Sequence, residues 1–79
     1  MTKIVKLRRT CFMAPEQWEG ELETGESLYA RERHGEWRVE VDDQVVGRGW
    51  EGSALDALYR MFDLPDEAFV EDEEGESDG

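Results

Sequence analysis

The middle of the chain repeats one arrangement, in which short segments of alternating apolar and polar residues are separated by turn signals. The clearest segment is 36–41, where Trp37 and Val39 fall on one face of an extended strand and the charged residues fall on the other. Similar segments span 17–22, 27–33 and 44–50, with turns expected at 23–26, 34–35 and 42–43. Because short connections of this kind join neighbouring strands, the pattern predicts an antiparallel meander.

The N-terminal segment 3–9 is a further strand-like run and the only basic part of the chain. It combines β-branched residues with four of the nine positive charges. We expect this strand to lie against acidic neighbours and, as an edge strand, to oppose aggregation between sheets. Together these segments predict an α+β fold, in which a small antiparallel meander of three to four strands packs against one α-helix.

The helix is expected over 54–63. Ser53 is a good N-cap, and Asp56 three residues later resembles the acidic half of a capping box. An apolar stripe follows with helical spacing, formed by Leu55, Leu58, Tyr59 and Phe62. Pro65 ends the helix, and 66–70 is expected to add a further turn capped by Asp66, with Phe69 returning to the core.

The C-terminal segment 71–79 carries six acidic residues and no basic one, which is half of the formal net charge of −12. It has no apolar side chain to bury, so the sequence predicts a single α+β domain over 1–70 followed by a disordered acidic tail over 71–79. Because the chain is strongly negative, we do not expect it to bind nucleic acid directly or to bind an anionic membrane.

The composition also limits the chemistry of the chain. Cys11 is the one cysteine, so no intrachain disulfide forms and no Cys/His cluster is present to hold zinc. No apolar run approaches the roughly 20 residues of a membrane span, and the N-terminal residues do not resemble a signal peptide. We therefore expect a cytoplasmic protein without a cofactor.

The candidate catalytic residues are few, and each has a simpler structural interpretation. His34 is the single histidine and lies in a turn signal, where histidine tolerates a left-handed backbone. Cys11 follows two arginines that would lower a thiol pKa, but a small buried thiol is the simpler hypothesis. Asp42 and Asp43 lack the spacing of a calcium loop and fit a solvated turn. The sequence therefore predicts no enzymatic activity.

Arginines and aromatic residues alternate along two of the predicted strands. Arg31, Arg33 and Arg38 are expected on the sheet face opposite Trp37 and Leu28, an arrangement found in some single-stranded nucleic-acid platforms. Glutamates are interleaved with these arginines, so cross-strand ion pairs are the simpler expectation.

The middle third of the chain contains a pattern made of the stretch 14–20, which contains Trp18 and Gly20, followed by Gly25, by Tyr29, Arg31 and Arg33, by Gly35 and by the stretch 37–39. This pattern resembles small uncharacterised acidic proteins of bacteriophages and their hosts. The resemblance implies an accessory protein and supplies no catalytic residue.

The predicted function is that of a small non-enzymatic binding protein, for example an inhibitor that imitates DNA and engages a basic protein surface. The candidate partner-binding residues are Asp42, Asp43, Glu71, Asp72, Glu73 and Glu74. In the alternative hypothesis the chain is a halotolerant structural domain whose acidic residues serve solubility alone. The sequence leaves the oligomeric state open.

Overall fold

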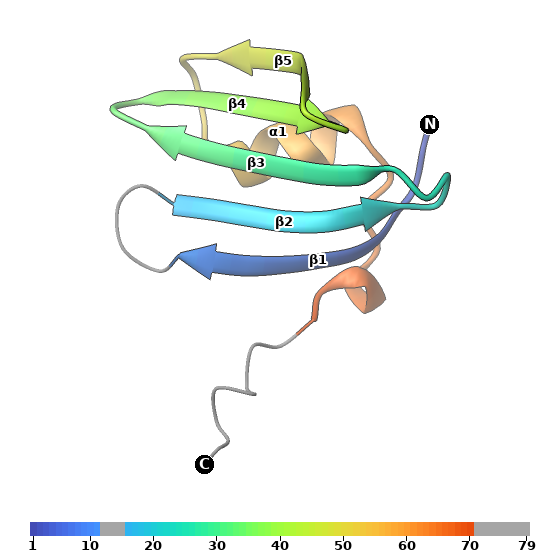
Figure 1. The fold of residues 1–79 in the computed structure, drawn as a ribbon. Helices are drawn as coiled ribbons and strands as arrows, with labels where there is room; N and C mark the ends of the chain where they lie inside the picture. The colour runs from blue at the N-terminus through green and yellow to red at the C-terminus, as the bar shows by residue number, and fades with distance from the viewer. Residues whose placement is uncertain (12–15, 71–79) are drawn as a thin grey trace.

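The computed structural model describes residues 1–11 and 16–70, which form one antiparallel sheet with a helix against one of its faces (Figure 1). The strands follow one another in chain order across the sheet. They are β1 (Ile4–Cys11), β2 (Glu16–Leu22), β3 (Ser27–Arg33), β4 (Glu36–Val41) and β5 (Gln44–Gly49), and they are followed by the α-helix α1 (Ala54–Met61) and the 3-10 helix η1 (Asp66–Ala68). The predicted α+β class and meander are confirmed. The predicted tail, 71–79, lies outside the described residues.

The sheet has five strands, so the expected three to four was wrong. The count differs because β5 pairs with β4 along its length although it contains two glycines, which usually weaken a strand. Gly49 has to be a glycine, because β5 passes close to the ring of Trp37 at this position. A Cβ atom on Gly49 would lie 2.7 Å from Cζ2 of Trp37, so only a residue without a side chain lets β5 run beside this ring.

The basic strand β1 lies beside acidic residues of the neighbouring strand, as its charge predicts. Lys6 and Arg8 lie opposite Glu21 and Glu19 of β2 in the antiparallel register. The other edge of β1 is hydrogen-bonded to the segment that follows α1. There the Ile4 amide donates to the Asp63 carbonyl at 2.8 Å. The acidic neighbours expected for β1 are therefore confirmed.

The hydrophobic core lies between α1, η1 and one face of the sheet. Trp18 and Trp37 are both 8 % exposed, so each buries most of its ring in this core. The indole N–H of Trp37 donates to the backbone carbonyl of Glu51 at 2.9 Å, which fixes the ring in place. The inward direction predicted for Trp37 and Val39 is confirmed.

Helix α1 begins as predicted and ends two residues early. The amide of Asp56 donates to Ser53 Oγ at 3.1 Å and the amide of Ser53 donates to Asp56 Oδ2 at 3.3 Å, so the capping box is complete. The helix stops at Met61 because Phe62 adopts an extended conformation. Asp63 then pairs with the N-terminal residues, its amide donating to the Thr2 carbonyl.

The buried face of α1 differs in part from the predicted apolar stripe. Leu58 and Phe62 are buried, but Tyr59 is 48 % exposed and its inclusion in the stripe was wrong. The buried positions include Ala54 and Ala57, whose short side chains allow the helix to lie close to the sheet. The predicted turn after Pro65 exists as η1 and Phe69 packs against the core, but Asp66 makes no capping hydrogen bond.

Candidate functional site

The second face of the sheet is the candidate functional surface. Helix α1 contacts β3 and β4 on the core side, and η1 contacts β1, so no described element covers the opposite face (Figure 1). Side chains on a strand alternate between faces, and those of Tyr29, Arg31 and Arg33 therefore emerge on the open side while Leu28 and Ala30 enter the core. This open face has an acidic part in its middle and a basic part near the β3–β4 turn, and Lys6 and Arg8 of β1 adjoin the acidic part beside Glu21 and Glu19.

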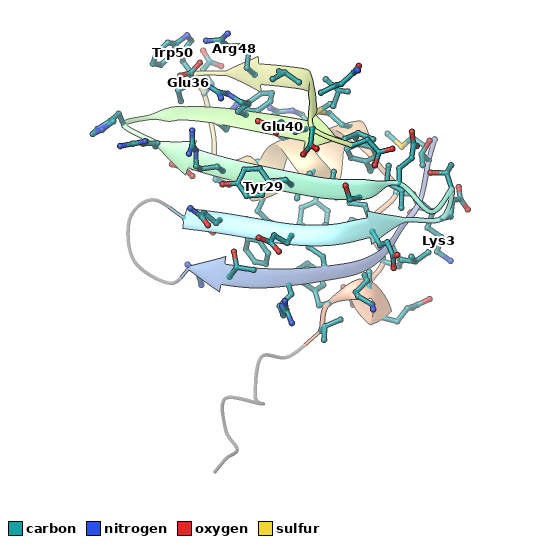
Figure 2. The ribbon with its side chains drawn as sticks, viewed as in Figure 1. Lys3, Tyr29, Glu36, Glu40, Arg48 and Trp50 are labelled. Carbon is teal, nitrogen blue, oxygen red and sulfur yellow. The ribbon has the colours of Figure 1, made fainter. Side chains whose placement is uncertain are left out.

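The acidic part is centred on Tyr29, and we call it the Tyr29 hollow. In the sheet register Tyr29 lies between Glu19 of β2 and Glu40 of β4, in a row that crosses three strands. Figure 2 shows Tyr29 and Glu40 on the exposed face of neighbouring strands. The shallow depression here is lined by Glu19, Gly20, Ser27, Leu28, Tyr29, Glu40 and Asp43. It thus combines one half-buried aromatic ring with three carboxylates and no basic side chain.

The two predicted partner-binding residues of the β4–β5 turn have different surroundings. Both Asp42 and Asp43 have positive φ angles, of 51° and 70°, as a tight two-residue hairpin turn requires. The Asp42 carboxylate accepts hydrogen bonds from the Ser27 amide at 2.9 Å and from the Ser27 hydroxyl at 3.2 Å, so it ties the turn to β3. Asp43 is exposed and lines the Tyr29 hollow. The structure therefore brings Asp43 together with Glu19 and Glu40.

The other predicted partner-binding residues, Glu71, Asp72, Glu73 and Glu74, lie outside the described residues.

The basic part of the open face lies at the end of the sheet where β3 turns into β4. We call it the arginine hollow, and its lining is formed by Arg31, Arg33, His34, Glu36, Arg38 and Trp50. His34 has a φ of 54° and forms the tight turn with Gly35, which confirms the predicted turn position. Figure 2 shows Trp50, Glu36 and Arg48 gathered at this end of β4 and β5.

The register of the strands places like charges side by side in this region. Arg31 lies directly opposite Arg38, and Arg38 lies opposite Arg48 on the next strand. Like charges at directly opposed positions destabilise a sheet. Three arginines of adjacent strands therefore form one row, in a protein whose overall charge is strongly negative.

Carboxylates neutralise only part of this row. Arg48 contacts Glu36 on the neighbouring strand at 2.8 Å, and Arg38 approaches Glu40 of its own strand at 3.9 Å. Within residues 1–11 and 16–70, neither Arg31 nor Arg33 forms an ion pair. The predicted cross-strand ion pairing is therefore wrong for Arg31, Arg33 and Arg38, and the cross-strand pair that forms here joins Arg48 and Glu36.

Trp50 is the residue of this surface that the sequence pattern did not single out. It was expected at the end of a strand, but it follows the end of β5 and is 71 % exposed. Its exposure could not be predicted from the sequence, because the close packing of Trp37 against the neighbouring Gly49 is a contact between strands.

The described residues hold no group of three or more histidine, cysteine or acidic side chains arranged to bind a metal ion. Within the same part of the chain, the structure contains no helix of sufficient length and apolar character to cross a membrane. Comparisons with protein-family models, with curated proteins and with solved structures found no match to this chain.

Proposed function

We propose that this chain is a non-enzymatic, cytoplasmic protein-binding domain whose Tyr29 hollow engages a basic surface of another protein. The observation that carries this proposal is the row Glu19–Tyr29–Glu40 on the uncovered face of the sheet. A lysine or arginine of the partner would lay its aliphatic stem and cationic end across the Tyr29 ring while the flanking carboxylates accept its hydrogen bonds. Tyrosine is also among the residues enriched in protein interfaces.

The resemblance to small phage proteins agrees with this role, because an acidic accessory protein can inhibit a host protein by occupying a basic surface that otherwise binds DNA. Acidic residues 71–74 would add long-range attraction, which raises the rate of association. The competing hypothesis, that acidic residues serve solubility alone, is supported by exposed carboxylates away from the hollow, such as Asp63 and Glu67.

A charge-reversal experiment separates the two hypotheses. The partner is first captured from host lysate at low salt, and its affinity is then measured with purified proteins. We expect the double variant Glu19→Lys/Glu40→Lys to bind at least about tenfold more weakly, since two attractive charge contacts become repulsive. Tyr29→Ala should weaken binding without changing its salt dependence.

Glu67→Lys is the matched control, because Glu67 is exposed on η1 and does not line the hollow. An affinity that falls equally in Glu67→Lys and in a single Glu40→Lys variant would show that net charge alone matters. Binding that does not change between about 50 and about 500 mM salt would contradict charge complementarity, since exposed charges are screened over roughly 10 Å already at about 0.1 M.

A further inference from the structure

The arginine hollow is a concentration of positive charge that the proposed function does not use. Its lining holds the guanidinium groups of Arg31, Arg33 and Arg38 against the single carboxylate of Glu36. That carboxylate is already held by Arg48, whose Nε and Nη2 donate to it at 3.0 and 2.8 Å. The hollow therefore has an excess of cationic donors, although the chain as a whole has 21 acidic and nine basic residues.

The fold places two of these arginines side by side. Arg31 and Arg38 are neighbours across β3 and β4, and their mutual repulsion is relieved when an anion binds between them. The planar guanidinium group offers paired N–H donors that match the oxygens of a phosphate group. Arg33 extends the same donor set toward the β3–β4 turn, on the same face of β3.

Trp50 gives the hollow a second kind of contact. Its ring lines the same depression as the arginines, and 71 % of its surface is exposed. An exposed indole beside guanidinium groups provides a flat apolar platform on which a heterocyclic base can stack. A ligand that uses both features carries phosphate groups at one end and a planar ring at the other.

The acidic part of the same face limits the size of such a ligand. Tyr29 and Glu40 are each two residues from the Arg31–Arg38 pair along their strands, and the Glu40 carboxylate approaches Arg38 at 3.9 Å, so the carboxylates of the Tyr29 hollow begin at the edge of the arginine hollow. A nucleic-acid strand crossing the sheet would pass over these carboxylates and be repelled. A compact ligand remains within the arginine hollow.

We propose that the arginine hollow binds a mononucleotide, with the phosphate groups on Arg31, Arg33 and Arg38 and the base stacked on Trp50. The site is separate from the Tyr29 hollow, so either proposal can fail without the other.

The test is a titration of the full-length protein with ATP, adenosine and pyrophosphate, followed by calorimetry and by tryptophan fluorescence. Trp18 and Trp37 are buried, so the long-wavelength emission arises from Trp50 and should be quenched by ATP. We expect ATP to bind at least about tenfold more tightly than either adenosine or pyrophosphate, because only ATP uses both halves of the site. We also expect ATP to raise the melting temperature.

Three variants locate the site. The variant Arg31→Gln/Arg33→Gln should weaken ATP binding at least about tenfold, because two charge-assisted contacts are lost. The variant Trp50→Ala should bind ATP no more tightly than it binds pyrophosphate, because the ring on which the base stacks has been removed. Arg60→Gln, which removes an exposed arginine of α1 outside the hollow, should leave the affinity unchanged. The far-UV circular dichroism of each variant confirms that it is folded.

Three results would overturn the proposal. The first is that ATP does not bind detectably at millimolar concentration, and the second is that the unmodified protein binds ATP and pyrophosphate equally well. The third is that the folded Arg31→Gln/Arg33→Gln variant binds ATP with unchanged affinity. A synthetic peptide of residues 71–79 offers carboxylates without a ring. If this peptide competes as well as ATP, the hollow accepts acidic peptides and the nucleotide assignment is wrong.

Discussion

The contact between β5 and Trp37 gives the sharpest test of the packing. Gly49→Ala would place a Cβ atom 2.7 Å from Cζ2, 2.9 Å from Cε2 and 3.0 Å from Nε1 of the Trp37 ring. The ring cannot easily move away, because its N–H donates to the Glu51 carbonyl and the residue is 8 % exposed. Overpacking of this kind costs about 1–3 kcal/mol.

A smaller stabilising effect opposes this cost. Replacing glycine by alanine restricts the unfolded chain, which stabilises the folded state by about 0.4–1 kcal/mol where the backbone conformation suits both residues. The net loss expected for Gly49→Ala is therefore about 1–2 kcal/mol, or roughly 5–10 °C in melting temperature for a domain of this size.

Gly47→Ala is the matched control on the same strand. Its Cβ atom would meet Cε of Met61 at 2.9 Å, which is the far end of a flexible side chain that can shift at little cost. Thermal and urea unfolding should therefore show a loss of less than about 1 kcal/mol for Gly47→Ala. In a Trp37→Leu background, Gly49→Ala should become neutral or stabilising. The packing argument fails if Gly47→Ala is as harmful as Gly49→Ala, or if Trp37→Leu does not relieve the Gly49→Ala defect.

Three further outcomes are expected from the same unfolding measurements. Trp37→Ala should cost about 3–5 kcal/mol and abolish the native dispersion of the amide NMR spectrum, because the largest ring of the β4–β5 side leaves the core; a well-dispersed spectrum at 25 °C would contradict this. Ser53→Ala should cost about 1 kcal/mol through loss of the capping box, whereas Ser53→Asp should retain most of the stability. Deletion of residues 71–79 should change the melting temperature by less than about 5 °C, since these residues contain no apolar side chain, and a larger fall would show that they contribute to folding.

The sequence alone predicted the features that depend on local interactions. Alternation in 36–41 placed Trp37 and Val39 in the core, and the turn at His34–Gly35 was recognised from residues that tolerate a positive φ. The Ser53–Asp56 capping box was likewise visible, because its two hydrogen bonds join residues three positions apart.

The tertiary structure decided the features that depend on contacts between distant segments. The fifth strand exists because Gly49 leaves space for Trp37, and α1 stops at Met61 because the next residues pair with the N-terminal strand. The candidate sites belong to both groups. The two-residue turn at His34–Gly35 fixes the register of the β3–β4 hairpin, and with it the opposition of Arg31 and Arg38. The meeting of these arginines with Trp50 was decided by the tertiary structure, because Trp50 follows β5 and reaches this end of the sheet only when β4 and β5 have paired. No local pattern in the chain determines that contact.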